Sequence, residues 1–356
     1  MNVSDFDFEL PESLIAQEAT ERGRSRLLVA PRAGGAFEHA MFSDLGRYLR
    51  EGDLLVLNDT RVFPARLRGR RDPSGGEVEC LLMGQPRPAE TAEAPGAEEW
   101  DALVHPGQKL KPGARMLFER EGSVLHGEIL ARRFQGRRTV RLWTGHPDGV
   151  TAIIDRIGHV PLPPYIKRDV GPGDRERYQT VYAGERGSIA APTAGLHFTG
   201  GQLASLVAAG VEQARVTLHV GYGTFKPVRV ERVEEHEVDP EWYSVPEAAA
   251  SALTRARREG RRVIAVGTTT VRVLESLDLT AEGQVSAASG ETRLFIHPGH
   301  RFRLVDGLIT NFHLPRSSLL MLVAAFAGRE RILDAYREAV AHGYRFYSYG
   351  DATVVV

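Results

Sequence analysis

The sequence of 356 residues has a single cysteine, Cys80, and no long hydrophobic run. One cysteine excludes internal disulfides and every zinc site built on several cysteines, and such usage is typical of a reducing compartment. The longest apolar run, from Leu319 to Ala327, is far too short to span a bilayer. The first residues, MNVSDFDFELPESL, are acidic and polar where a signal peptide would be basic and then apolar. We therefore expect a cytoplasmic protein that makes no contact with membranes.

Neither sign of charge is in excess, because 45 Lys and Arg residues balance 46 Asp and Glu residues. A global field that attracts nucleic acid is therefore absent, and any such contact needs a local patch. Several catalytic motifs are missing as well, namely HExxH, the GxSxG elbow and the Walker A loop. His297 and His300 form a lone pair on a predicted loop. We assign no metal ligands and expect no metal-dependent catalysis.

From Val62 to about Leu142 the chain consists mainly of short runs in which apolar and polar residues alternate. A predicted helix from Phe42 to Arg50 and a buried strand from Asp53 to Leu57 precede them. The six runs are FPARLRG, EVECLLMG, WDALVH, RMLFER, VLHGEIL and TVRLW, separated by Gly, Pro and charged residues. They predict a small antiparallel β-barrel. Between two of the runs, the Pro, Ala and Glu bias of Pro86 to Glu99 predicts a flexible, exposed loop.

After Gly158 the pattern changes to strand, loop and helix. Predicted strands are 188–191, 214–220 and 263–267. Predicted helices are 201–209, with Thr199 and Gly210 as candidate caps, and 246–259, 271–277, 318–328 and 329–342. A hairpin at Asp306 and Gly307 and a C-terminal strand pair around YRFYSYGDATVVV complete the prediction. This alternation predicts an α/β fold with a largely parallel sheet and flanking helices. We expect a discontinuous α/β catalytic domain, residues 1–61 and 159–356, into which the β-barrel domain, residues 62–158, is inserted.

The segment RVIAVGTTTVRVLESL runs from a buried strand through Gly267 and three threonines into a helix. A helix N-terminus has free backbone N–H groups and a partial positive charge, so it suits a carboxylate or phosphate. Arg272, in the first turns, would add a bidentate partner. The structural alternative is that Thr268 or Thr269 is only an N-cap and that Arg272 pairs with an acidic neighbour such as Glu275.

Three further segments contain polar groups at the positions where ligands of α/β sheets gather. PTAGLHFT combines Gly195 with the titratable His197, although a structural role for that histidine is the more common one. TNFHLPRSS places Asn311 and His313 before an apolar helix. The C-terminal YRFYSYGD is rich in tyrosine and would either stack a base or form an ordinary half-buried strand.

Arginine clusters occur at 61–71, 132–141 and 255–262, and the first two fall in the predicted barrel. Exposed arginine side chains usually only make a protein surface soluble and have no specific partner. With Phe63, Phe134 and Trp143 interspersed on one small β module, the clusters also match an RNA-binding surface.

A resemblance narrows these alternatives. Eleven blocks carry it: DFDFELPESLIAQE, LNDTRVFPARL, PGQKLKPG, GHVPLPPYIKR, RYQTVYA, APTAGLHFT, TLHVGYGTFKPVRVE, VIAVGTTTVRVLES, LITNFHLP, SSLLMLVAAFAG and YRFYSYGDA. In the order and approximate spacing of these blocks, the chain resembles the S-adenosylmethionine:tRNA ribosyltransferase-isomerases over its whole length. Tyr222 and the long, acidic stretch from Pro86 to Glu99 depart from the family pattern.

The resemblance implies a transferase of queuosine biosynthesis that uses S-adenosylmethionine as a ribosyl donor. The ribosyl group would be transferred and isomerised onto 7-aminomethyl-7-deazaguanine at the tRNA wobble position, giving epoxyqueuosine and releasing adenine and methionine. By matching blocks, the acid and base candidates are His197, His219 and His313. Contacts to S-adenosylmethionine are expected from Thr193, Gly195, Thr268, Thr269, Thr270 and Arg272. Contacts to tRNA are expected from Arg61, Arg66, Arg68, Arg70, Arg71, Arg132, Arg133, Arg137, Arg138, Tyr349 and Asp351. We expect a monomer.

Two other functions remain possible from the residues alone. A non-catalytic RNA-binding protein would explain the arginines but not the polar loops of the α/β part. A methyltransferase with the same cofactor would normally have a glycine-rich turn after its first strand and an acidic residue at the end of the next, and neither is evident here.

Overall fold

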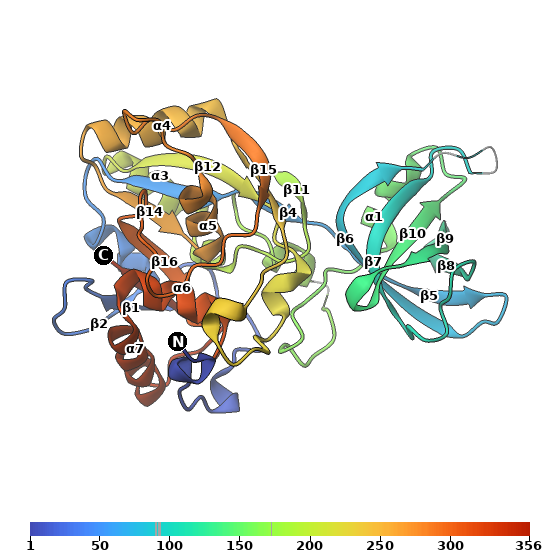
Figure 1. Cartoon of the computed structure of the whole chain (residues 1–356), viewed down its shortest axis with the longest axis horizontal. Helices are drawn as coiled ribbons and strands as arrows, with labels where there is room; N and C mark the ends of the chain where they lie inside the picture. The colour runs from blue at the N-terminus through green and yellow to red at the C-terminus, as the bar shows by residue number, and fades with distance from the viewer. Residues whose placement is uncertain (90, 92–93, 172) are drawn as a thin grey trace.

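The computed structural model describes residues 1–89, 91, 94–171 and 173–356. Within these residues the chain forms a large α/β body that contains both termini, and a smaller β-barrel that stands beside it (Figure 1). No helix in the described ranges combines the length and the apolar character needed to cross a membrane.

A nine-stranded sheet forms the centre of the α/β body. In spatial order its described strands are β15 (Ala288–Thr292), β13 (Glu241–Val245), β12 (Glu212–Leu218), β3 (Leu54–Asn58), β14 (Val263–Val266), β16 (Gly307–Asn311), β17 (Ala352–Val355), β1 (Arg26–Ala30) and β2 (Glu38–Met41). The pairs from β12 through β3 and β14 to β16 are parallel, as is β17 with β1. The other pairs are antiparallel. The sheet is therefore mixed, whereas the sequence predicts a largely parallel one. The βα alternation on which that prediction rests covers only the central strands.

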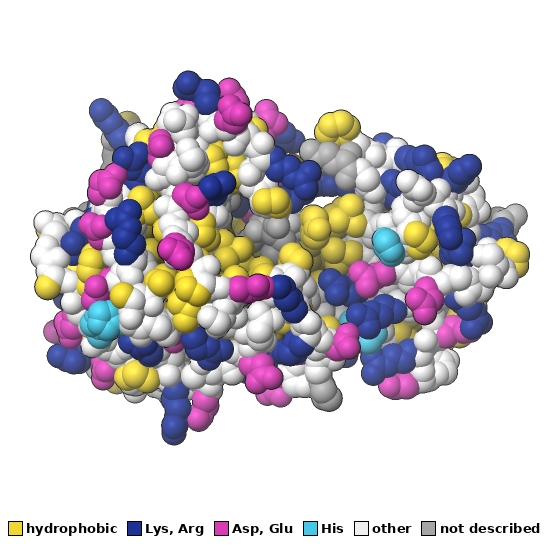
Figure 2. Space-filling model, turned by 90° about the horizontal axis from the view of Figure 1, so that it is seen from below, with side chains coloured by type: hydrophobic (Ala, Val, Ile, Leu, Met, Phe, Trp, Pro, Cys, Tyr) yellow, Lys and Arg dark blue, Asp and Glu magenta, His cyan; other side chains and the backbone are white. Residues whose placement is uncertain are grey.

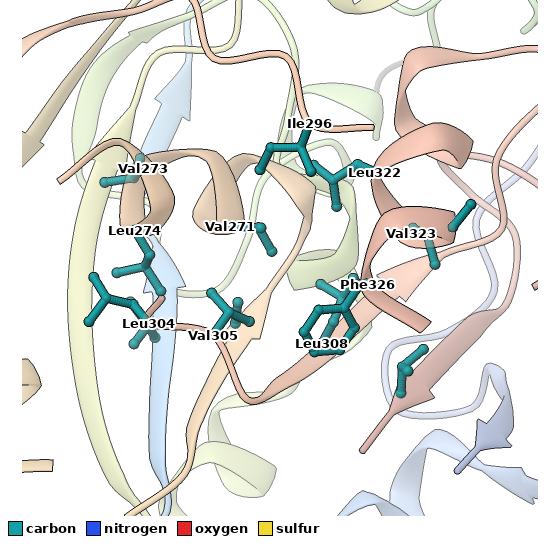
Figure 3. Packing of buried hydrophobic residues seen from close by; sticks show 14 of the residues in the cluster. Val271, Val273, Leu274, Ile296, Leu304, Val305, Leu308, Leu322, Val323 and Phe326 are labelled. Carbon is teal, nitrogen blue, oxygen red and sulfur yellow. The ribbon is translucent and has the colours of Figure 1, made fainter. Parts of the chain in front are cut away.

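Every residue of β3 is buried, because helices cover both faces of the sheet. Leu54 and Val56 belong to the core under α4 (Glu247–Arg258), α5 (Thr268–Ser276), α6 (Ser318–Ala327) and α7 (Arg329–Ala341). Leu55 and Leu57 belong to the core on the opposite face, with α3 (Gly200–Ala208) and the short helix η3 (Phe42–Arg47). Figure 3 shows residues of this first core, with Val271 and Leu274 of α5 on one side and Val323 and Phe326 of α6 on the other.

The barrel is closed and antiparallel, in the order β10-β7-β6-β5-β8-β9. Its strands are β5 (Arg66–Asp72), β6 (Glu77–Pro88), β7 (Glu98–His105), β8 (Arg115–Arg120), β9 (Ser123–Arg132) and β10 (Arg137–Trp143). Each contains most of one of the six alternating runs, so the predicted barrel is confirmed. Fully buried Trp100 and Phe118 fill its interior, and α1 (Gly149–Ile157) packs against β8, β9 and β10. Closure leaves no strand edge exposed, which small β modules otherwise have to protect.

Shorter elements connect the two parts. Strands β4 (Thr60–Val62) and β11 (Glu185–Ser188) pair in parallel next to the barrel. The remaining described helices are α2 (Asp174–Arg177) and the 3-10 turns η1 (Val3–Phe6), η2 (Glu12–Leu14), η4 (Phe134–Gly136), η5 (Thr193–His197), η6 (Tyr222–Phe225) and η7 (Val233–Glu235).

Several predicted elements differ in the structure. The Asp306 and Gly307 hairpin is wrong: β16 starts at Gly307 and pairs in parallel with β14, and the Asp306 carboxylate accepts a hydrogen bond from the Val263 amide. The C-terminal strand pair is also wrong, since only β17 is a strand and it lies between β16 and β1. The helix from Phe42 is a 3-10 helix that ends at Arg47. In the predicted Pro86 to Glu99 loop, β6 extends to Pro88 and β7 begins at Glu98, and residues 90, 92 and 93 lie outside the described residues.

Candidate active site

The site begins at the turn between β14 and α5. Gly267 has a φ of 88°, a left-handed conformation that favours glycine, and it takes the N-cap position of α5. No side chain caps the helix, so the prediction that Thr268 or Thr269 does so is wrong. The Thr269 hydroxyl instead accepts a hydrogen bond from Asn58 Nδ2 at 3.2 Å. The first amides of α5 therefore have no side-chain cap of their own.

Four segments that are far apart in the sequence surround one small cavity of about 50 Å³ at this turn. The lining residues from these segments are Pro192, Thr193, Ala194, Val220, Thr224, Gly267, Thr268, Thr269, Thr310, Asn311, Phe312 and His313. Because the loops follow the central strands β12, β14 and β16, they meet at the carboxyl edge of the parallel region, where α/β folds bind ligands.

Asn311 contributes an unsatisfied polar atom to this cavity. Its Nδ2 donates to Tyr347 O and to His197 Nε2, each at 3.1 Å. Its Oδ1 is buried and has no hydrogen-bond partner among the described residues. A buried acceptor without a donor is costly, and this atom is able to accept a hydrogen bond from an N–H group of a ligand.

The three histidines named from the sequence differ in position. His313 lines the cavity, and its Nε2 lies 3.1 Å from Thr310 Oγ1. His197 does not line the cavity and lies between Asn311 and Ser25. The Ser25 hydroxyl is 2.7 Å from His197 Nδ1. Burial lowers the pKa of each to about 3, with Arg177 and Arg22 adding to the effect at His197. Both are therefore neutral near pH 7.

His219 lies next to the cavity residue Val220, at the end of β12. Its Nδ1 is 2.8 Å from the Thr60 hydroxyl, and its ring stacks on Trp242. Burial lowers its pKa to about 4. Gly187 leaves room for this imidazole, because a Cβ there would lie 2.4 Å from His219 Nε2.

Arg272 does not lie in the small cavity. Its guanidinium forms an ion pair with Glu241 of β13 and donates to Leu294 O at 2.9 Å, and both charged side chains are nearly buried. The partner is thus Glu241, whereas Glu275 accepts backbone hydrogen bonds from Arg303, Leu304 and Val305. The structural alternative is therefore wrong about the partner of Arg272, and the expected contact of Arg272 with S-adenosylmethionine stays a prediction.

Of the other residues expected to contact S-adenosylmethionine, some line the cavity and others have a role in the fold. Thr193, Thr268 and Thr269 line the cavity. Thr270 is fully buried and donates to Val266 O at 2.6 Å, so its hydroxyl serves the helix. Gly195 serves packing, because a Cβ at this position would lie 2.1 Å from the Tyr182 hydroxyl oxygen.

A much larger cleft of about 1190 Å³ lies between the barrel and the α/β body. The space-filling view in Figure 2 shows a hollow between the two parts with hydrophobic and basic side chains around it. The cationic lining residues are Arg87, Arg133, Arg137, Lys226, Arg229, Arg272 and Arg293. Phe134 also lines this cleft and is 85% exposed. Thr224 and Leu319 line both the cleft and the small cavity, so the two spaces adjoin there.

The arginines of the barrel do not form one patch. Arg133 and Arg137 line the large cleft, and Arg137 pairs with Asp239 of the α/β body at 2.8 Å. Arg66 and Arg68 border a different hollow, beside residues 162–170. Arg70 pairs with Glu119 at 2.8 Å. Arg61 and Arg132 are exposed, and Arg71 is half-buried against Gly76.

Three residues expected to contact tRNA have buried side chains in the structure. Arg138 is buried and donates to the carbonyls of Gly136, Arg137 and Gly107. Tyr349 is buried, and its hydroxyl donates to Asp174. Asp351 is buried and accepts from the amides of Arg26 and Arg345, both at 2.8 Å. All three satisfy polar groups of the fold.

Sequence reasoning missed two features of the site. The Arg272 and Glu241 pair joins residues 31 positions apart, and the His197 and Ser25 contact joins residues 172 apart. No local sequence pattern predicts either contact. The sequence predicts Asn311 only as part of a polar segment. An amide side chain directly before an apolar helix is the signal that points to this residue.

Comparisons with known proteins agree with this architecture. A family model described as queuosine biosynthesis protein matches residues 3–355, so the chain is a queuosine biosynthesis protein. It is 50% identical to the S-adenosylmethionine:tRNA ribosyltransferase-isomerase of Moorella thermoacetica and 51% identical to that of Carboxydothermus hydrogenoformans, with 100% of both chains covered in each case. A crystal structure of S-adenosylmethionine tRNA ribosyltransferase from Thermotoga maritima is 38% identical, with a TM-score of 0.55 over 99% of this chain and 100% of that chain. The chain belongs to the S-adenosylmethionine:tRNA ribosyltransferase-isomerase family of enzymes.

Proposed function

We propose that the enzyme transfers and isomerises the ribosyl group of S-adenosylmethionine onto 7-aminomethyl-7-deazaguanine at the wobble position of tRNA. The products would be epoxyqueuosine-tRNA, adenine and methionine. The observation that carries this proposal is the junction of the two spaces at Thr224 and Leu319. A donor held in the small cavity would meet a base presented from the large cleft at that junction.

The size of the cavity limits what it holds. Ligand pockets for small molecules usually measure about 300 to 1,000 Å³. A cavity of about 50 Å³ accommodates one end of S-adenosylmethionine, and the rest would extend toward the cleft. Asn311 Oδ1 fits the adenine end, because the exocyclic amino group of adenine donates hydrogen bonds.

The chemistry requires a base and assistance to the leaving adenine. The sulfonium of S-adenosylmethionine acidifies the C5′ proton, so a neutral imidazole close to it can accept that proton. His313 is our first candidate because it lines the cavity in its neutral form. His197 would position Asn311, and His219 is the alternative base. Thr193, Thr268 and Thr269 would contact the donor, assisted by the free amides of α5.

The remaining expectations are also part of the proposal. Residues 62–158 would be a domain inserted between residues 1–61 and 159–356, with barrel arginines that bind tRNA phosphates. We propose a monomeric, cytoplasmic enzyme that needs no metal ion for turnover.

The decisive experiment supplies S-adenosylmethionine labelled in the adenine ring together with tRNA that contains 7-aminomethyl-7-deazaguanine. We expect free adenine, methionine and modified tRNA, in the presence of EDTA as well. The His313→Ala variant should lose at least about a hundredfold in kcat, the lower range for general base catalysis. The exposed His105→Ala variant, on the barrel, is the matched control and should retain full activity. S-adenosylhomocysteine as product would instead identify a methyltransferase, and tRNA binding without turnover would identify an RNA-binding protein.

A further inference from the structure

A cluster of three metal-ligating side chains lies outside the cavity and the cleft. It consists of His39, Glu338 and His342, whose possible ligand atoms all lie within 4.8 Å of one another. His39 Nε2 is 3.1 Å and His342 Nδ1 is 3.3 Å from Glu338 Oε1. The two imidazole rings lie 4.4 Å apart, centre to centre. None of the three residues lines the spaces assigned to the substrates.

The fold brings these residues together from opposite ends of the chain. His39 is on β2, the last strand of the sheet, which pairs only with β1 within the described residues. Glu338 and His342 stand four residues apart at the C-terminal end of α7, so they lie on the same face of the helix. All three side chains are at least partly open to solvent, which leaves a path for an ion.

A partner behind His39 orients its ring. Its Nδ1 is 2.9 Å from the hydroxyl of Tyr344, which is buried. Histidine ligands of metals usually donate the second ring nitrogen to such a group, which fixes the tautomer. With Nδ1 donating, the lone pair of Nε2 faces Glu338. Arg26 is the positive group close by: its guanidinium lies over the Tyr344 ring at 3.7 Å and donates to His342 O.

We propose that His39, Glu338 and His342 bind a divalent transition metal, with Zn²⁺ the best match. Two imidazoles and one carboxylate, with water as the fourth ligand, form a usual tetrahedral Zn²⁺ set, and Co²⁺ and Ni²⁺ accept the same donors. Mg²⁺ and Ca²⁺ prefer all-oxygen sites and are not expected to bind. The ion would connect the edge strand β2 to α7, so its effect would be on stability and not on the proposed chemistry.

The test uses the full-length protein, freed of metal by chelator and dialysis, in titrations with ZnCl2. We expect one equivalent to bind, and Co²⁺ to give the intense visible absorption of a tetrahedral site. His39→Ala and His342→Ala should each weaken Zn²⁺ affinity at least about tenfold, whereas His105→Ala should bind as the parent does. The substituted side chains are near the surface, and circular dichroism of each variant verifies that it is folded.

Thermal unfolding provides a second measurement. Zn²⁺ should raise the Tm of the parent and of His105→Ala but not of His39→Ala, since a ligand stabilises only the state that it binds. Equal affinity in all variants, or no binding to the parent, would overturn the proposal. Because adenine release is expected to be the same with and without the ion, failure of this site would leave the proposed transferase reaction untouched.

Discussion

His197, His219 and His313 show how burial decides the state of a titratable side chain. Their folded-state pKa values of about 3, 4 and 3 lie well below the value of about 6.5 for an unperturbed histidine. In the interval between these values the unfolded chain binds more protons than the folded one. The folded state is therefore fully favoured above pH 6.5 and loses stability as the pH falls toward 4.

This linkage gives a measurable prediction for His313. In urea unfolding at pH 7, 6, 5 and 4.5, the free energy of unfolding of the parent should fall with pH. The slope for His313→Gln should be smaller by up to about 1.4 kcal/mol per pH unit, because one histidine no longer takes up a proton on unfolding. Substitution of the exposed His105 should leave the slope unchanged. Identical slopes for His313→Gln and the parent would show that folding does not lower the pKa of His313.

The Arg272 and Glu241 pair leads to a second prediction at this scale. Arg272→Met should lower the free energy of unfolding by about 3 kcal/mol, because it leaves a buried carboxylate without its cation. In Arg272→Met/Glu241→Gln the unpaired charge is gone, so part of the loss should be recovered. Chemical denaturation of the two variants measures the difference. If both were equally unstable, loss of packing and not of charge compensation would be the cause.

At the scale of elements, local signals predicted helix boundaries well where side chains form the cap. Thr199 accepts a hydrogen bond from the Gln202 amide at 3.0 Å, and Gln202 Oε1 accepts from the Thr199 amide at 3.0 Å. This reciprocal pair starts α3 one residue before the expected position. At α5 the same reasoning failed, because the backbone of Gly267 replaces a side-chain cap.

The cap of α3 can be tested directly. Thr199→Ala should reduce the free energy of unfolding by about 1 kcal/mol, since the Gln202 amide loses its acceptor. Ser205→Ala, an exposed position in the same helix, should change it by less than about 0.5 kcal/mol. Guanidinium unfolding of both variants gives the comparison. An equal effect of the two substitutions would mean that α3 begins through packing alone.

At the scale of the whole molecule, the placement of the barrel determines which arginines face the cleft. We expect Arg133→Ala/Arg137→Ala, which removes two arginines that line the cleft, to lower the slope of log tRNA affinity against log salt by about one to two units, because each phosphate contact releases counterions. Arg68→Ala/Arg70→Ala is the matched control, since these exposed arginines lie near Glu79 and Glu119. Affinity measured across a range of salt concentrations separates the pairs. The reverse result would locate the tRNA at Arg68 and Arg70.

The sequence by itself determined the barrel strands and the helices after residue 200, because periodicity, caps and turn residues are local properties. Its resemblance to one family also identified the enzyme class. Tertiary structure alone decided that β17 enters the sheet antiparallel to β16, that Arg138, Tyr349 and Asp351 are internal, and that Arg272 pairs with Glu241. The same holds for His39 and Glu338, which are 299 residues apart. Burial and pairing depend on which distant surfaces pack together, and no local pattern encodes that choice.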